Sequence, residues 1–195
     1  RVNLCQPSWS TTAINSTVKP TTIWDPAQYM NMWSVNFTDN TLLGYAQFPE
    51  SSLGGMATTA QNPNTDGVVA NYTTFGSSDL ASGSFAPPYD KGRTMTHEVG
   101  HFLGLRHIWG DNSTCPATNT ANDKDFVADT PAANAANFGC PTGTNTCTGN
   151  PGNDMIENYM DYTDDACMYM FSAGQKTRMQ AVFASGGPRV SFAQP

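Results

Sequence analysis

All three histidines of the chain lie in one eleven-residue stretch, residues 97–107 (HEVGHFLGLRH). His97 and His101 are four positions apart, so on a helix their imidazoles point to the same side. Gly104 can adopt the left-handed conformation that ends a helix, and the chain can then bring His107 back to the same point. Three imidazoles leave the fourth position of a zinc ion open to water. The stretch therefore predicts a helix ending at Gly104 and a catalytic zinc site.

Glu98 lies directly after the first histidine, where its carboxylate can face the same cleft as the zinc ligands. A carboxylate in this position can act as the general base of a metallopeptidase. A bare HExxH pattern also occurs by chance on ordinary helices, and a single histidine is more often a core or surface residue than a ligand. Here every position of the longer HExxHxxGxxH pattern is matched. We therefore interpret the stretch as a zinc site with Glu98 as general base.

The length and charge of the chain narrow the possible classes of protein. Its 195 residues are enough for one domain with a core of its own. With nine Lys and Arg and a formal net charge of −7, the chain offers no basic patch for a phosphate backbone, which argues against nucleic acid as a partner. No apolar run is long enough to span a bilayer, and no signal-like segment begins the chain. We expect a soluble protein, either mature or already processed.

The cysteines and the low content of charged residues are typical of a secreted protein. Charged residues make up 13% of the chain, and Cys5 stands apart from the other four cysteines. No CxxC pair is present, so disulfides are favoured over a cysteine zinc cluster. Four cysteines allow three pairings, and their spacing does not choose among them. These four are Cys115, Cys140, Cys147 and Cys167.

Apolar residues alternate with polar ones in residues 29–37, which predicts a strand. Two more strands are predicted on either side of the glycine- and proline-bearing stretch 49–66. A helix is expected to begin near residues 90–93 and to carry the zinc stretch. A final helix is predicted from about residue 172 to residue 184, with an apolar stripe formed by Phe171, Met179, Val182 and Phe183. The three predicted strands are residues 29–37, 43–48 and 67–75.

Between the two helices, residues 110–154 show almost no apolar periodicity. Pro, Gly, Asn, Asp and Cys dominate this segment. A loop of this length inside a compact domain needs something other than a core to hold it in place. Disulfides and metal ions are the expected means.

These features resemble the metzincin metallopeptidases, and within them the ulilysin-like members of the pappalysin family. Ile108 rather than Glu follows the third histidine, which argues against the astacin and serralysin branches. The resemblance implies a single α+β catalytic domain over residues 1–195, a metzincin-type zincin. Residues 1–104 would form a mixed twisted sheet with the active-site helix, and residues 105–195 a loop-rich, disulfide-stapled subdomain. Besides the zinc stretch, the resemblance rests on residues 129–131 (DTP), 158–162 (NYMDY) and 171–175 (FSAGQ).

The resemblance also implies roles for residues after the zinc stretch. Met160 would form a hydrophobic floor beneath the zinc rather than a ligand, although a methionine is more often simply part of a core. Tyr162 would donate its hydroxyl to the developing oxyanion. Asp165 matches an acid that selects Arg or Lys just after the scissile bond, because a buried carboxylate favours a cationic partner. The alternative for Asp165 and its acidic neighbour is a solvated turn.

The segment of residues 123–130 resembles a calcium-binding loop of the same enzymes. Hard oxygen ligands at short spacing suit calcium. The expected ligands are the side chains of Asp125 and Thr130 and the carbonyl of Ala128, with Asp129 as a further participant. No EF-hand pattern is present, so the alternative is an acidic surface loop. The family's crossed cysteine pairing would give the disulfides Cys115–Cys147 and Cys140–Cys167.

The resemblance has one departure, at the start of the chain. The family's catalytic domain begins with a strand and a long helix behind the sheet, and residues 1–28 show no convincing counterpart of that helix. Val2–Cys5 looks more like the family's second strand. The chain is then expected to lack the first strand and helix. Arg1 is the residue that a protease cutting before arginine would leave at a new N-terminus, and Cys5 would pair outside the chain or stay free.

The sequence thus predicts a secreted zinc endopeptidase that acts on protein or peptide substrates, with a structural calcium ion and a monomeric state. The predicted strand at residues 43–48 could pair with an extended substrate along the cleft. One alternative is a zinc-binding, non-catalytic adhesion or interaction module, against which Glu98 argues, because a binding module has no need of that carboxylate. Another is a zinc hydrolase of a non-peptide amide or ester.

Overall fold

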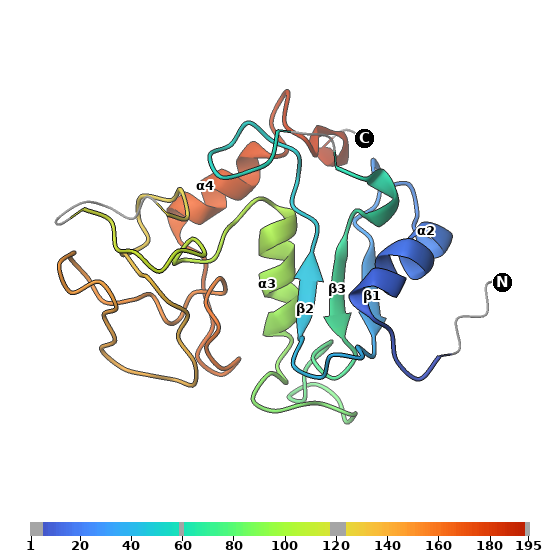
Figure 1. Ribbon diagram of the computed structural model, residues 1–195, viewed down its shortest axis with the longest axis horizontal. Coiled ribbons are helices and arrows are strands. Elements are labelled where there is room, and N and C mark those ends of the chain that lie inside the picture. Colours follow the sequence, from blue (N-terminus) through green and yellow to red (C-terminus); the bar gives the residue numbers. More distant parts are fainter. Residues whose placement is uncertain (1–5, 59–60, 118–123, 194–195) are drawn as a thin grey trace.

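A small mixed sheet lies at the centre of the computed structural model, and its strands fall within the three predicted segments (Figure 1). The strands are β1 (Met32–Val35), β2 (Gly44–Ala46) and β3 (Val68–Asn71), in the order β1-β3-β2. β1 pairs with β3 in parallel, and β2 pairs with it antiparallel, which confirms a mixed sheet. The structure describes residues 6–58, 61–117 and 124–193.

The central strand β3 is covered on both faces, because Val68, Val69 and Ala70 are all inaccessible to solvent. Neighbouring residues of a strand point to opposite faces, so a strand buried on both sides is apolar throughout. Val69 packs with Phe37 against the N-terminal helical segment. The helix α3 (Arg93–Phe102) contacts β2 and β3, on the other side of the sheet from that segment (Figure 1). The zinc stretch is thus carried by a helix fixed to a buried sheet.

The N-terminal helical segment was not expected from the sequence. Ile14 and Val18, one helical turn apart, are buried against the sheet. The sequence analysis found no convincing counterpart of the family's helix behind the sheet in residues 1–28, whereas the structure has a helical segment packed on the sheet there. The segment is rich in Thr, Ser and Asn and includes Pro20, so its stability comes from packing of one narrow apolar face rather than from helix propensity. The expected strand Val2–Cys5 lies outside the described residues. The segment comprises α1 (Thr11–Ala13), a π-helical stretch (Ile14–Val18) and α2 (Lys19–Thr22).

The helix α3 ends as predicted. Its last residue is Phe102, and Gly104 has φ +86°, a left-handed conformation that glycine adopts without strain. Leu105 N–H donates to the carbonyl of Gly100 at 2.9 Å, which closes the turn. The chain therefore reverses after the second histidine and returns His107 toward the helix.

The C-terminal helix α4 (Ala173–Ala181) begins with a capping box of Ser172 and Gln175 and ends before residue 184. The expected apolar stripe is only partly correct, because the buried side chains within the helix are Gln175 and Arg178. Their polar groups are satisfied: Gln175 exchanges two hydrogen bonds with Asn158, and Arg178 Nε donates to the carbonyl of Gly104 at 2.7 Å. α4 is therefore held by polar contacts that the sequence pattern does not reveal. Two short 3₁₀ helices are Pro63–Thr65 and Val190–Ala193.

The loops that follow α3 occupy the side of that helix away from the sheet (Figure 1). Both disulfides implied by the family resemblance are present, Cys115–Cys147 and Cys140–Cys167. A second core lies beneath these loops, formed by Leu105, Ile108, Trp109, Ala133 and Met160. The loop-rich, disulfide-stapled half is therefore confirmed. No helix among the described residues is long and apolar enough to cross a membrane.

Candidate metal centre

The three histidines of the zinc stretch converge on one point. His107 Nε2 lies 3.2 Å from His97 Nε2 and 3.1 Å from His101 Nε2. Nitrogen ligands at zinc–nitrogen distances of about 2.0–2.1 Å in a tetrahedron are about 3.3–3.4 Å apart. The spacing of the three Nε2 atoms therefore suits a zinc ion.

The hydrogen-bond partners of the Nδ1 atoms determine which nitrogen of each imidazole ring carries the hydrogen. His97 Nδ1 lies 2.6 Å from the carbonyl of Tyr159, and His101 Nδ1 lies 2.8 Å from the carbonyl of Leu105. A carbonyl only accepts, so both Nδ1 atoms carry hydrogen and both Nε2 atoms present lone pairs. Burial lowers the pKa of His97 well below its usual range and that of His101 to about 4, so both rings are neutral at neutral pH. Converging lone pairs repel one another unless a cation lies between them.

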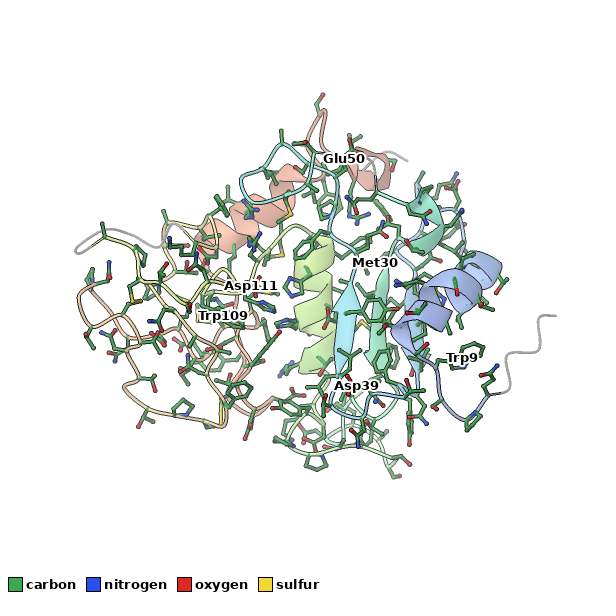
Figure 2. All side chains as sticks on the ribbon, in the orientation of Figure 1. Trp9, Met30, Asp39, Glu50, Trp109 and Asp111 are labelled. Atoms are coloured by element: carbon green, nitrogen blue, oxygen red, sulfur yellow. A yellow bond between two sulfur atoms is a disulfide. The ribbon has the colours of Figure 1, made fainter. Side chains whose placement is uncertain are left out.

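His107, the histidine beyond the end of the helix, is held by side chains. Its Nδ1 donates to Asp111 Oδ1 at 2.5 Å. The ring of Trp109 stacks on the imidazole with the ring centroids 4.4 Å apart and the planes within 1° of parallel. Trp109 and Asp111 lie in the loops beside α3 (Figure 2). The sequence analysis did not predict these contacts, and the glycine and aspartate that closely follow the third histidine are the pattern that could have suggested them.

Glu98 is buried beside the three histidines. Its Oε2 has no hydrogen-bond partner among the described residues, and burial raises the pKa of its carboxyl group to about 8. Gly44 of β2 leaves space for it, because a Cβ at that position would lie 2.8 Å from Glu98 Oε1. A cavity of about 500 Å³ is lined by the three histidines, Glu98, Tyr162 and Asp165. The structure thus brings the predicted zinc ligands, base, tyrosine and acid to one cavity.

Tyr162 stands at the edge of the histidine cluster. Its ring centroid lies 4.8 Å from that of His107 and 5.6 Å from that of His97. Burial and the nearby charge of Asp111 raise the pKa of Tyr162 to about 12. The hydroxyl therefore keeps its proton at neutral pH and can act as a hydrogen-bond donor.

Met160 is completely buried directly against α3. A Cβ at Gly100 would clash with the Met160 sulfur, so the absence of a side chain there allows the methionine to approach the helix. Met160 also accepts a hydrogen bond from Ile108 N–H at its carbonyl and donates one to Asn158 Oδ1 from its own N–H. These contacts join the turn at Met160, the helix and the loop of His107 into one packed unit.

Asp165 lies at the start of α3 and lines the cavity. Its Oδ2 accepts hydrogen bonds from the N–H groups of Lys91, at 2.7 Å, and Arg93, at 3.2 Å. Its Oδ1 is buried and has no partner in the described part of the chain. Burial raises the pKa of Asp165, while these hydrogen bonds and the charge of Arg93 lower it. One carboxylate oxygen therefore anchors the helix, and the other is left available.

The expected calcium loop is only partly assembled. Asp125 is buried, and its carboxylate accepts from Val127 N–H at 3.0 Å and lies 2.7 Å from Thr130 Oγ1. The carbonyl that approaches Thr130 Oγ1, at 2.9 Å, belongs to Val127 rather than to Ala128. The Asp129 carboxylate instead accepts from Ser172 Oγ and Gly174 N–H at the start of α4. Asp125 and Thr130 therefore meet, whereas Asp129 is engaged elsewhere.

Comparison with known proteins identifies the family. The model of peptidase family M43, described as pregnancy-associated plasma protein-A, matches residues 13–184. The chain belongs to the pappalysin family of peptidases. This pappalysin is 39% identical over 154 residues to an extracellular metalloprotease of Arthroderma benhamiae, a match that covers 79% of the chain and 47% of the relative. It is 41% identical over 141 residues to one of Sordaria macrospora, covering 72% of the chain and 44% of the relative.

Solved structures confirm the fold. Mature mirolysin of Tannerella forsythia, in complex with a cleaved peptide, is 41% identical, with a TM-score of 0.78 over 96% of this chain and 65% of the mirolysin chain. Mirolysin in complex with a small compound gives a TM-score of 0.76 at 40% identity, over 96% of this chain and 66% of the mirolysin chain. The α+β metzincin fold and the ulilysin-like resemblance are thereby confirmed. This pappalysin spans about half the length of the curated relatives that it matches.

Proposed function

We propose that this pappalysin is a secreted zinc-dependent endopeptidase that cleaves protein or peptide substrates. The convergence of three lone-pair nitrogens in one cavity with Glu98, whose buried Oε2 has no hydrogen-bond partner among the described residues, supports this most directly. The extracellular metalloproteases among its relatives support secretion, and the cleaved peptide in the mirolysin complex supports a peptide substrate. A non-catalytic zinc-binding module is disfavoured, because burying Glu98 Oε2 without a hydrogen-bond partner costs stability and a binding module has no need of that carboxylate.

His97, His101 and His107 would hold the zinc ion through their Nε2 atoms. When bound, zinc supplies Lewis acidity, which acidifies a water molecule and polarises a carbonyl. Glu98 takes a proton from the attacking water as general base and then delivers it to the leaving amine. Its burial, which raises the affinity of the carboxylate for a proton, favours this shuttle. Tyr162 keeps its own proton and donates a hydrogen bond to the developing oxyanion.

The strand β2 would align the substrate. β2 is an edge strand of the sheet, and Gly44, Tyr45 and Ala46 line the cavity. An extended peptide can add to such an edge through backbone hydrogen bonds, which bind many sequences equally. Glycine at position 44 leaves space for Glu98. Backbone pairing would thus set the register of the substrate, while the side chains that line the cavity would determine which substrate residues the enzyme prefers.

Chelation and reconstitution test the proposed function. An internally quenched peptide should be cleaved by the purified protein, lose cleavage when a chelator removes zinc, and regain it on addition of one zinc ion per chain. Cleavage that persists in a zinc-free protein, verified by metal analysis, would contradict the proposal.

We further propose that Asp165 selects Arg or Lys just after the scissile bond. Its unpaired Oδ1 can bind a cationic substrate side chain, and hydrogen bonds to charged groups contribute about 1.5–3 kcal/mol. Asp165→Asn should therefore lower kcat/KM for an Arg peptide by roughly 10–100-fold, with little change for a matched Leu peptide. The neighbouring Asp164→Asn variant serves as the control. Because Asp165 also anchors α3, an equal loss for both peptides would indicate a structural role and contradict the pocket assignment.

A calcium ion at the Asp125 loop is also proposed. The Asp125 carboxylate, Thr130 Oγ1 and the Val127 carbonyl provide hard oxygens within one turn. Burial raises the pKa of Asp125 to about 7, and a bound cation would favour its ionised form. Calcium should raise the melting temperature of the zinc-loaded protein, and Asp125→Asn should abolish that increase. An equal increase in wild type and variant would place the calcium elsewhere.

A further inference from the structure

His107, the third metal ligand, needs contacts from other side chains to hold it in place more than His97 and His101 do. His97 and His101 are carried by α3, and their Nδ1 atoms contact backbone carbonyls. His107 lies beyond the end of the helix, on a turn, and its Nδ1 contacts a carboxylate. An anionic acceptor makes an imidazole a stronger base at its other nitrogen than a neutral carbonyl does, and it fixes the ring tautomer.

The backbone after His107 turns so that the Asp111 carboxylate comes back to the His107 ring. Gly110 and Asp111 have φ values of +62° and +57°, so two consecutive residues are left-handed. For an aspartate this conformation is uncommon, and it persists where the surroundings hold it. Gly110 N–H donates to the carbonyl of His107 at 2.8 Å, which closes the turn. The side chain of Asp111 is thereby directed back to the residue four positions before it.

Further contacts hold both the carboxylate and the ring. Arg106 Nη2 lies 3.4 Å from Asp111 Oδ2, and Arg106 Nη1 donates to the carbonyl of Gly55 at 2.9 Å. Trp109, only 8% exposed, covers one face of the imidazole, and Tyr162 packs edge-on against both rings. The His107 ring is therefore fixed in tautomer by Asp111 and in plane by Trp109.

We propose that Asp111 and Trp109 are positioning residues for His107, and that Asp111 strengthens the retention of zinc. This inference rests on the proposed zinc site. Partners of this kind alter metal affinity by about 10–100-fold when removed. Asp111→Ala should weaken zinc binding by that amount, and Asp111→Asn, which retains an oxygen acceptor without the charge, by less. Trp109→Leu should change the visible absorption of the cobalt-substituted protein, because the ring is then free to tilt.

Zinc affinity would be measured by competition with a chromophoric chelator, alongside melting of the metal-free proteins. Asp39→Ala is the control, since Asp39 is an exposed loop carboxylate that accepts hydrogen bonds from Thr41 (Figure 2). Weaker zinc binding by Asp111→Ala with unchanged metal-free melting supports the proposal. Affinities within twofold of the control overturn it. If Asp111→Ala unfolds, Asp111→Asn decides: unchanged affinity there means a structural role and overturns the proposal. Failure of the wild type to bind one zinc ion would instead refute the proposed function.

Discussion

Replacing Glu98 by Gln is expected to lower kcat/KM for peptide cleavage by about 10²–10⁴-fold, the usual contribution of a general base. Gln has the same shape but cannot accept the proton of the attacking water. The zinc content should remain at one ion per chain, because the histidines hold the metal and Glu98 Oε2 makes no contact that the described structure needs. Burial raises the pKa of Glu98, so the neutral amide should also fit the site without loss of stability.

Glu50→Gln is the matched control, since Glu50 is an exposed carboxylate that does not line the cavity of the histidines. Its activity should equal that of the wild type. Metal analysis and turnover would be measured on the same samples. If Glu98→Gln lost its zinc together with its activity, the separation between metal ligands and base would be wrong. Wild-type turnover by Glu98→Gln would exclude Glu98 as the base.

Removing the Cys115–Cys147 disulfide by replacing both residues with Ser is expected to lower the free energy of unfolding by roughly 3–4 kcal/mol. The two cysteines are 32 positions apart, and a loop of this length gives that value in the chain-entropy account. The segment that this disulfide closes has few apolar residues. Little other than the disulfide therefore restricts the conformations of this segment in the unfolded chain. Urea denaturation of the zinc-loaded proteins would measure the loss.

Reduction of the wild type provides the comparison for the disulfide variant. Because it opens both disulfides, the reduced wild type should be less stable than the variant that lacks only Cys115–Cys147. A loss below about 1 kcal/mol in the variant would show that the loops are held by other contacts, such as the hydrogen bonds of Asp154 with Thr146 and Asn137.

The convergence of the three histidines was predictable because it depends on local geometry. A spacing of four residues on a helix and a glycine that ends it determine where the three histidines meet, and the structure has α3, Gly104 and the convergent Nε2 atoms in that arrangement. The strand in residues 29–37 was predictable for the same reason, because its alternation of apolar and polar residues is local. The disulfide pairing was not, since three pairings suit the spacing, and only the family resemblance selected the observed one.

The features that the sequence did not reveal depend on contacts between distant residues. The N-terminal helix is stable because Ile14 and Val18 meet Phe37 and Val69, and its own composition predicts little helix. Asp129 belongs to an acidic run that resembles calcium ligands, yet Ser172 and Gly174 engage its carboxylate from more than forty positions away. Such partners become visible only when the chain is folded.

Mapping of new peptide ends tests the central claim most directly. A denatured proteome would be incubated with the zinc-loaded protein, with and without a chelator, and the new N-termini identified by mass spectrometry. We expect chelator-sensitive cuts, predominantly before Arg or Lys, that are absent with Glu98→Gln. Chelator-sensitive cuts without that preference would contradict the role of Asp165 alone. No cleavage by a protein shown to carry one zinc ion would contradict the assignment of this chain as an endopeptidase.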